Sequence, residues 1–147
     1  MAVVKCYVDT SILVAAHCSE PETGRVQSWL TARRPSDLVG CSWLLTEVAS
    51  ALSFKERRGE INKSRHHTIS SDILAFLSQL VTMEPPTEKD FEVAATFCHN
   101  AASHLRAGDA LHLAVALRLK ARYIVTLDSV LLENALAQGL LDGLLLS

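Results

Sequence analysis

The 147-residue sequence lacks features that mark several common protein classes. Neither charge is in excess, since fourteen Lys and Arg stand against sixteen Asp and Glu. The four cysteines are widely spaced and form no Cys-x-x-Cys pair. No uninterrupted apolar run approaches the roughly 20 residues that cross a bilayer. These absences exclude general coating of polyanions, a zinc or redox site built on paired cysteines, and a membrane-spanning helix.

Glycine is also scarce, and the six glycines show neither the G-x-G-x-x-G nor the P-loop spacing that cradles nucleotide phosphates. The apolar N-terminus is interrupted by Lys5 and Asp9, so it does not read as a secretion signal. We therefore expect a cytoplasmic protein whose cysteines stay reduced and fill small positions in the core.

Short apolar runs alternate with helical patterns along the whole chain. Strands are predicted over 3–8, 38–41, 81–83 and 123–126, and the apolar segment 140–146 is expected to close the sheet. A helix follows each strand, and the longest helical pattern, over 64–80, carries an apolar stripe of Ile69, Ile73, Leu74 and Leu77. The sequence thus predicts one α/β domain over residues 1–147, with a parallel central sheet and helices on both faces.

Four acidic residues stand where such a fold would bring them together. Asp9 and Asp128 each follow a predicted strand, Glu47 lies inside an otherwise apolar helix, and Asp109 lies in the first turn of another. Ligands of open α/β sheets bind beyond the carboxyl ends of the strands, so these acids are expected at one edge. Each also has an ordinary structural explanation, as a helix cap, a first-turn residue or part of a solvated helix face.

Convergence of these carboxylates would require a counter-charge. Two carboxylates about 6 Å apart repel each other by roughly 2.8 kcal/mol at an effective dielectric near 20. The cluster must therefore take up protons or bind a cation. Oxygen ligands without His or Cys suit Mg²⁺ or Mn²⁺, and a carboxylate-held metal can activate water for cleavage of a phosphodiester bond.

The sequence resembles the PIN-domain family, specifically the small VapC-like ribonuclease toxins of toxin–antitoxin pairs. Four segments carry the resemblance, in this order: Tyr7-Val8-Asp9-Thr10-Ser11, Leu45-Thr46-Glu47-Val48, Gly108-Asp109-Ala110-Leu111-His112-Leu113-Ala114 and Val125-Thr126-Leu127-Asp128. Each segment alone is a weak signal, but their order and spacing fit the family from the first strand to about Gly139.

The resemblance implies a PIN-like fold and a Mg²⁺- or Mn²⁺-dependent endoribonuclease. By position, Asp9, Glu47 and Asp109 would be the main metal ligands, and Asp128 would be the fourth catalytic acid. Thr10 and Ser11 match hydroxyl positions beside the first Asp, and Thr126 is expected to support Asp128 in the same way. His112 also matches a common family position, but we expect it to be a packing residue.

Basic residues suggest where RNA would lie. Lys55, Arg57 and Arg58 belong to a cluster whose contacts with phosphates would give sequence-tolerant affinity for RNA. The alternative is a solvated helix end, where cations are favourable in any case. Arg106, three residues before Asp109, is the better single candidate for contact with the scissile phosphate.

Two other functions compete with this interpretation, and the first of them does not fit the residues. A phosphatase that uses the first Asp would need a second Asp two residues later, where this chain has Ser11. A non-catalytic PIN-like module that only binds proteins is the more serious alternative. The resemblance also implies a VapB-like antitoxin partner and a homodimer. Trp29 is expected in the core, with contact to the antitoxin as the alternative.

Overall fold

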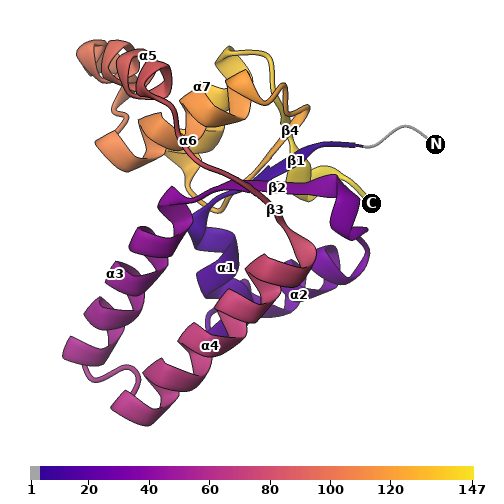
Figure 1. The fold of residues 1–147 in the computed structure, drawn as a ribbon, viewed down its shortest axis with the longest axis vertical. Coiled ribbons are helices and arrows are strands. Elements are labelled where there is room, and N and C mark those ends of the chain that lie inside the picture. Colours follow the sequence, from indigo (N-terminus) through magenta and orange to yellow (C-terminus); the bar gives the residue numbers. More distant parts are fainter. Residues whose placement is uncertain (1–3) are drawn as a thin grey trace.

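The computed structural model describes residues 4–147, and it contains a five-stranded parallel sheet (Figure 1). The strands run in the order β3-β2-β1-β4-β5. Their bounds are β1 Cys6–Val8, β2 Leu38–Cys41, β3 Thr82–Glu84, β4 Tyr123–Val125 and β5 Leu141–Asp142. The strand predicted over 3–8 is therefore shorter, and its first residue, Val3, lies outside the described residues.

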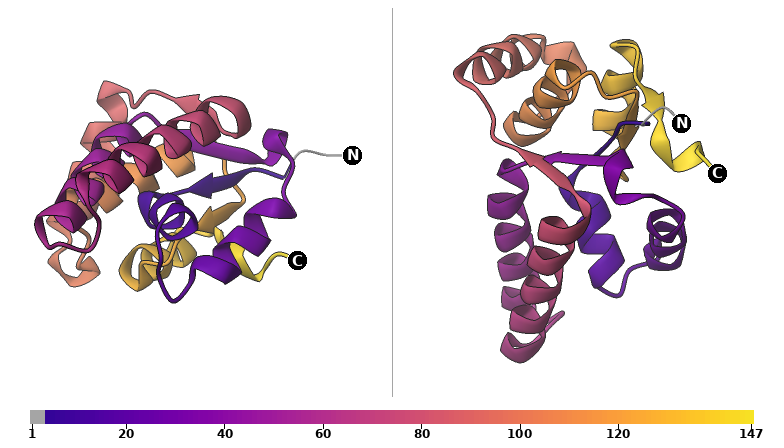
Figure 2. Two further views of the ribbon diagram at one scale, coloured as in Figure 1. Left: turned by 90° about the horizontal axis from the view of Figure 1, so that it is seen from below. Right: turned by 45° about the vertical axis from the view of Figure 1, so that its right-hand side comes forward.

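Seven α-helices cover both faces of the sheet, as Figures 1 and 2 show. One face carries α1 Thr10–His17, α2 Thr23–Thr31, α3 Trp43–Arg57 and α4 Lys63–Leu80. The other face carries α5 Glu88–His99, α6 Ala107–Arg118 and α7 Ser129–Ala137. The predicted α/β architecture is confirmed. Within residues 4–147, no helix combines the length and the hydropathy that crossing a membrane requires.

Successive side chains along the short strands point to opposite faces of the sheet, so the interior contains two cores. In β1, the side chains of Cys6 and Val8 join the core under α1 to α4, whereas Tyr7 joins the core under α5 to α7. All three residues are fully buried. A strand that is buried on both faces reads as a continuous apolar run, which is why this segment was recognisable in the sequence.

The order of the strands creates a crevice next to β1. The chain adds β2 and then β3 on one side of β1, and it returns to place β4 on the other side. This reversal lies between β1 and β4, whose residues pair directly from Cys6 with Tyr123 to Val8 with Val125. Open α/β sheets bind ligands at such a point, beyond the carboxyl ends of the strands.

Helices α3 and α4 form an antiparallel pair that projects from the sheet (Figures 1 and 2). Gly59 follows α3 with a φ of +76°, the left-handed conformation that ends helices at low cost when glycine adopts it. In α4, Ile69, Ile73 and Leu77 are buried, but Leu74 is 53% exposed. The prediction that Leu74 belongs to the buried stripe is wrong, because it is turned by about 100° around the helix from Ile73.

Three further expectations are decided by packing. Cys98 is exposed, so the expectation that all four cysteines fill the core fails for this one. The predicted C-terminal strand is only two residues long, and Gly143–Leu145 form a 3₁₀ turn instead. Trp29 is buried, and its indole Nε1 donates to the carbonyl oxygen of Gly143 at 2.7 Å. Trp29 therefore lies in the core rather than on a binding surface.

Candidate active site

Asp9 lies at the carboxyl end of β1, at the reversal of the sheet. It is the N-cap of α1, and its side chain is only 3% exposed in a shell of donors. Its Oδ1 accepts from the Ser11 hydroxyl at 2.6 Å, and its Oδ2 accepts from the Thr126 hydroxyl at 2.6 Å. Burial raises the pKa of Asp9, and these hydrogen bonds oppose the rise only in part.

Thr126 joins the ends of β1 and β4. Besides donating to Asp9, its hydroxyl accepts from the backbone N–H of Asp128 at 2.9 Å. Asp128 is the N-cap of α7, and its Oδ1 accepts from the N–H of Leu131 at 2.9 Å. The structure thus places the acids after β1 and β4 at the same edge of the sheet, with Thr126 between them.

Glu47 reaches this edge from the second turn of α3. Its Oε1 accepts a hydrogen bond from the Thr10 hydroxyl at 2.6 Å and another from Nε2 of His112. Burial would raise the pKa of Glu47, but the hydrogen bonds from His112 and Thr10 outweigh it and hold that pKa below its usual value. Glu47 is therefore a fixed, ionised carboxylate.

His112 has a role that the sequence analysis missed. It is 1% exposed and packs edge-on against Tyr7, which agrees with the expected packing residue. It also connects two buried groups, because its Nδ1 lies 2.7 Å from the Tyr7 hydroxyl while its Nε2 contacts Glu47. An ionised Glu47 can only accept, so Nε2 of His112 carries the proton of this hydrogen bond. Its position three residues after Asp109 was the available signal, since that spacing places both on one side of α6.

Asp109 lies in the first turn of α6 and completes the acidic set. Burial, together with the negative charges of Asp128, Asp9 and Glu47, raises its pKa to about 6. Burial is the larger cause of that rise, and the neighbouring carboxylates add to it.

Gly108 allows α6 to approach α3 closely. A Cβ at this position would lie 2.6 Å from Oε2 of Glu47 and 3.2 Å from Nε1 of Trp43. That Nε1 is buried and has no hydrogen-bond partner among residues 4–147. The second carboxylate oxygen of Glu47 therefore lies in a narrow space between the two helices.

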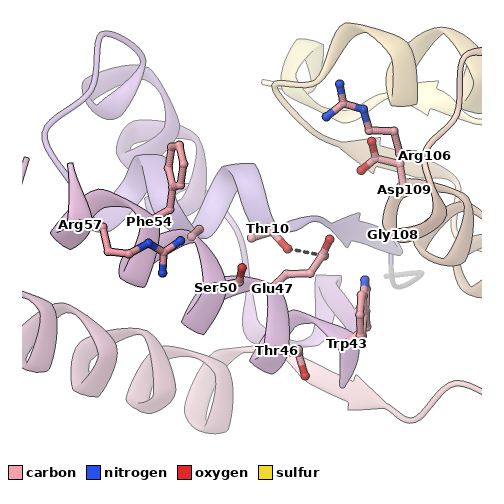
Figure 3. A pocket seen from close by; sticks show the side chains of 11 residues that line it. Thr10, Trp43, Thr46, Glu47, Ser50, Phe54, Arg57, Arg106, Gly108 and Asp109 are labelled. Atoms are coloured by element: carbon pink, nitrogen blue, oxygen red, sulfur yellow. Dashed lines mark hydrogen bonds between the residues drawn. The ribbon is translucent and has the colours of Figure 1, made fainter.

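A cleft of about 610 Å³ is lined by Glu47 and Asp109, whereas Asp128 lines a separate pocket together with Thr126. Figure 3 shows Glu47, Ser50, Phe54 and Arg57 along α3 on one side, with Arg106 and Asp109 at the start of α6 across from them. Arg106 is the N-cap of α6, and its side chain lines the cleft. Two of the arginines proposed as RNA contacts, Arg57 and Arg106, thus border the cleft that holds Glu47 and Asp109.

The other two proposed RNA contacts are placed differently. Lys55 forms ion pairs with Glu20 at 3.1 Å and Glu60 at 3.6 Å, and it lines a separate pocket. Arg58 is 60% exposed and lies 3.8 Å from Glu60, outside the lining of the acidic cleft. Lys55 is therefore committed to structural ion pairs, and of Lys55, Arg57 and Arg58 it is Arg57 that lines the acidic cleft.

The donor set fits a hard divalent cation, although the side chains are not gathered around one point. Among residues 4–147, no three His, Cys, Asp or Glu side chains are grouped closely enough to hold an ion as they stand. Glu47 is turned toward Thr10 and His112, and burial together with the neighbouring negative charges raises the pKa of Asp109. Carboxylate oxygens with unbalanced charge are the environment that Mg²⁺ and Mn²⁺ prefer.

Comparisons with known proteins agree with this fold. Ribonuclease VapC47 of Mycobacterium tuberculosis (strain CDC 1551 / Oshkosh) is 30% identical over 137 residues, which cover 90% of this chain and 91% of that protein. The crystal structure of VapC20 from Mycobacterium tuberculosis, a toxin that cleaves the Sarcin-Ricin loop, matches with a TM-score of 0.72 at 19% identity, covering 94% of this chain and 98% of its own. FitAB bound to an IR36 DNA fragment matches with a TM-score of 0.69 at 16% identity over 97% of both chains. The family model of the PIN domain matches residues 6–135, and the chain therefore belongs to the PIN domain family.

Proposed function

We propose that this protein is an endoribonuclease that cleaves RNA phosphodiester bonds with Mg²⁺ or Mn²⁺ held by Asp9, Glu47, Asp109 and Asp128. One observation carries the proposal: the four acids lie close enough at the reversal of the sheet that the charges of the other three add to burial in raising the pKa of Asp109 to about 6. Folding stability does not require such a concentration of negative charge beside an open cleft. The cluster therefore indicates a functional site.

The surrounding residues divide the work of holding these carboxylates. Ser11 and Thr126 fix the two oxygens of Asp9, while Thr10 and His112 fix Oε1 of Glu47. A bound divalent metal would supply a nucleophilic water of lowered pKa and would stabilise the charge that develops on the phosphate oxygens.

Arginines on both sides of the cleft supply the positive charge that a phosphodiester needs. Arg106 borders the cleft beside Asp109, and Arg57 borders it on α3. Guanidinium groups bind phosphate in a fixed fork geometry, which suits them to orient the RNA backbone next to the acids. The total charge of −2 does not oppose this role, because without the four proposed ligands fourteen basic residues face twelve acidic ones.

The relatives support a biological setting for this activity. Ribonuclease VapC47 is named for RNA cleavage, and VapC20 is described as a toxin. We extend this setting to the present chain: a cytoplasmic toxin of a VapBC-type pair, a homodimer, restrained by a VapB-like antitoxin. Growth arrest on expression of this chain, relieved by the product of an adjacent short reading frame, is the expected result, and harmless expression would contradict it.

The direct test is cleavage of RNA by the purified protein. The wild type is expected to cleave with Mg²⁺ or Mn²⁺ and to lose activity in EDTA, and Asp109→Asn is expected to be inactive. Asp72→Asn is the matched control, because Asp72 lies exposed on α4 and carries the same change of charge. Equal cleavage by the wild type and Asp109→Asn would point to a contaminating nuclease and leave a non-catalytic PIN-like binding module as the function.

A further inference from the structure

Phe54 is an exposed aromatic side chain that the acidic cleft does not need for its stability. It is 50% exposed, and among the exposed large apolar side chains of residues 4–147 it is the one that lines this cleft. A single exposed ring is ordinary on a protein surface, but this one lies in the cleft that holds Glu47 and Asp109, where a flat group of the substrate would cover it.

The neighbours of Phe54 identify the chemistry of that partner. The guanidinium carbon of Arg58 lies 5.3 Å from the centre of the Phe54 ring, and that of Arg57 lies 5.9 Å from it. Arg57 is held by a hydrogen bond of 2.8 Å from its Nη1 to the Ser53 hydroxyl. Both guanidinium groups lie over the ring. A nucleotide matches this arrangement, because its flat base would replace them on the ring while its phosphate pairs with them.

The position of Phe54 along α3 connects it with the proposed scissile phosphate. Phe54 follows Glu47 by seven residues, which places it two turns and about 10 Å further along the same side of the helix. Ser50 and Ala51, which lie between them in the sequence, are small and also line the cleft. Figure 3 shows Ser50 between Glu47 and Phe54. A strand of RNA that lies along α3 would therefore reach the ring close to its cleavage point.

We propose that Phe54 is a stacking platform for one unpaired base of the RNA substrate near the cleaved bond, with Arg57 and Arg58 binding the adjoining phosphates. This inference rests on the proposed ribonuclease function and adds a requirement to it. A base stacks on a protein ring only when its own face is free, so the substrate is unpaired at this nucleotide. Duplex RNA of the same sequence therefore has no free base to stack on Phe54.

The test measures binding separately from cleavage. Fluorescence anisotropy gives the Kd of an unpaired fluorescent RNA oligonucleotide, and of the same RNA annealed to its complement, for the full-length Asp109→Asn protein. In this background we expect Phe54→Leu to weaken binding of the unpaired RNA about tenfold, whereas Phe54→Tyr retains it. Binding of the duplex is expected to be the same with and without Phe54→Leu.

Phe91→Leu is the matched control, because Phe91 is 54% exposed on α5 and does not line the cleft. We expect it to leave the Kd unchanged. Abasic substitutions along the oligonucleotide locate the stacked base. At one position, removal of the base is expected to raise the Kd for the protein that retains Phe54. The same substitution is expected to cause no further rise in the Kd for Phe54→Leu. The KM of cleavage by the otherwise wild-type protein is expected to rise in Phe54→Leu.

The outcomes separate this inference from the function on which it rests. RNA cleavage by the wild type, together with an unchanged Kd in Phe54→Leu, would overturn the stacking subsite and leave the ribonuclease proposal intact. Loss of binding to a copurifying protein partner, with unchanged RNA binding, would assign Phe54 to a protein contact and also overturn it. Absence of both RNA cleavage and RNA binding in the wild type would remove the proposed function and this inference together.

Discussion

Gly108 lies so close to Glu47 that a methyl group on its Cα would fall 2.6 Å from the Glu47 carboxylate. The far end of a flexible side chain would normally move aside at little cost. Here the carboxylate is held by Thr10 and His112, and Nε1 of Trp43 lies on the other side of Gly108. The close approach of α6 to α3 therefore fixes where this acid lies.

Gly108→Ala is accordingly expected to separate stability from activity. Alanine favours a helix by up to about 1 kcal/mol over glycine, so urea unfolding should show little loss of stability. Displacing the Glu47 carboxylate should lower RNA cleavage by roughly 10- to 100-fold. Gly24→Ala is the control, because Gly24 is also the second residue of a helix and a Cβ there would meet nothing within 4 Å. Full activity of Gly108→Ala would show that the position of this carboxylate is unimportant.

Tyr7→Phe tests the buried chain from Tyr7 through His112 to Glu47. Removing the hydroxyl leaves Nδ1 of His112 without its hydrogen-bond partner, which should lower the free energy of unfolding by about 1 to 2 kcal/mol. It also releases the constraint on the imidazole that holds Glu47, so the affinity for Mn²⁺ measured by titration calorimetry should fall roughly tenfold.

The matched control is Tyr123→Phe, which removes the only other tyrosine hydroxyl of the chain. The hydroxyl of Tyr123 makes no hydrogen bond within residues 4–147, so both quantities should stay at their wild-type values. A loss of stability in Tyr7→Phe with unchanged affinity for Mn²⁺ would mean that His112 packs without orienting Glu47.

Asp109 makes the stability of the metal-free protein depend on pH. Its pKa rises from the model-peptide value of 3.8 to about 6 on folding, so the folded state binds this proton more tightly than the unfolded state. The contribution is fully present below pH 3.8 and is lost as the pH rises through about 6.

Asp109→Asn isolates this contribution from those of the other acids. In EDTA, the variant should gain about 2 kcal/mol relative to the wild type between pH 4 and pH 7, a figure reduced to allow for partial exposure of the carboxyl group. Urea denaturation of both proteins at several pH values provides the measurement. A difference in stability that is the same at every pH would show that folding does not raise the pKa of Asp109.

Arg106→Gln tests the contact with phosphate. Loss of one phosphate contact should weaken binding of RNA regardless of its sequence, and it should reduce the slope of log Kd against log salt by about 1. Lys89→Gln removes a positive charge from α5, at a side chain that is 76% exposed and pairs with Glu92, and it should leave the slope unchanged. An unchanged slope in Arg106→Gln would place Arg106 outside the path of the RNA.

Much of the fold followed from local patterns. Strands β1, β2 and β4 are buried on both faces, so they stand out as short apolar runs between polar turns. The ends of the helices were also legible, because Asp128 caps α7 and Gly59 adopts the left-handed conformation after α3. Leu74 and Cys98 were misplaced because an apolar side chain at the edge of a helical stripe is buried only when another element covers it.

The sequence alone determined the fold class and the elements that carry Asp9, Glu47, Asp109 and Asp128. In a parallel sheet, residues that directly follow strands must emerge at one edge, and this rule needs no side-chain coordinates. The tertiary structure decided which groups act together: His112 on Glu47, Thr126 on Asp9, Arg57 beside the cleft, and Lys55 in ion pairs away from it. Those relationships join residues far apart in the chain or depend on which way a helical side chain turns, and only the packed structure fixes both.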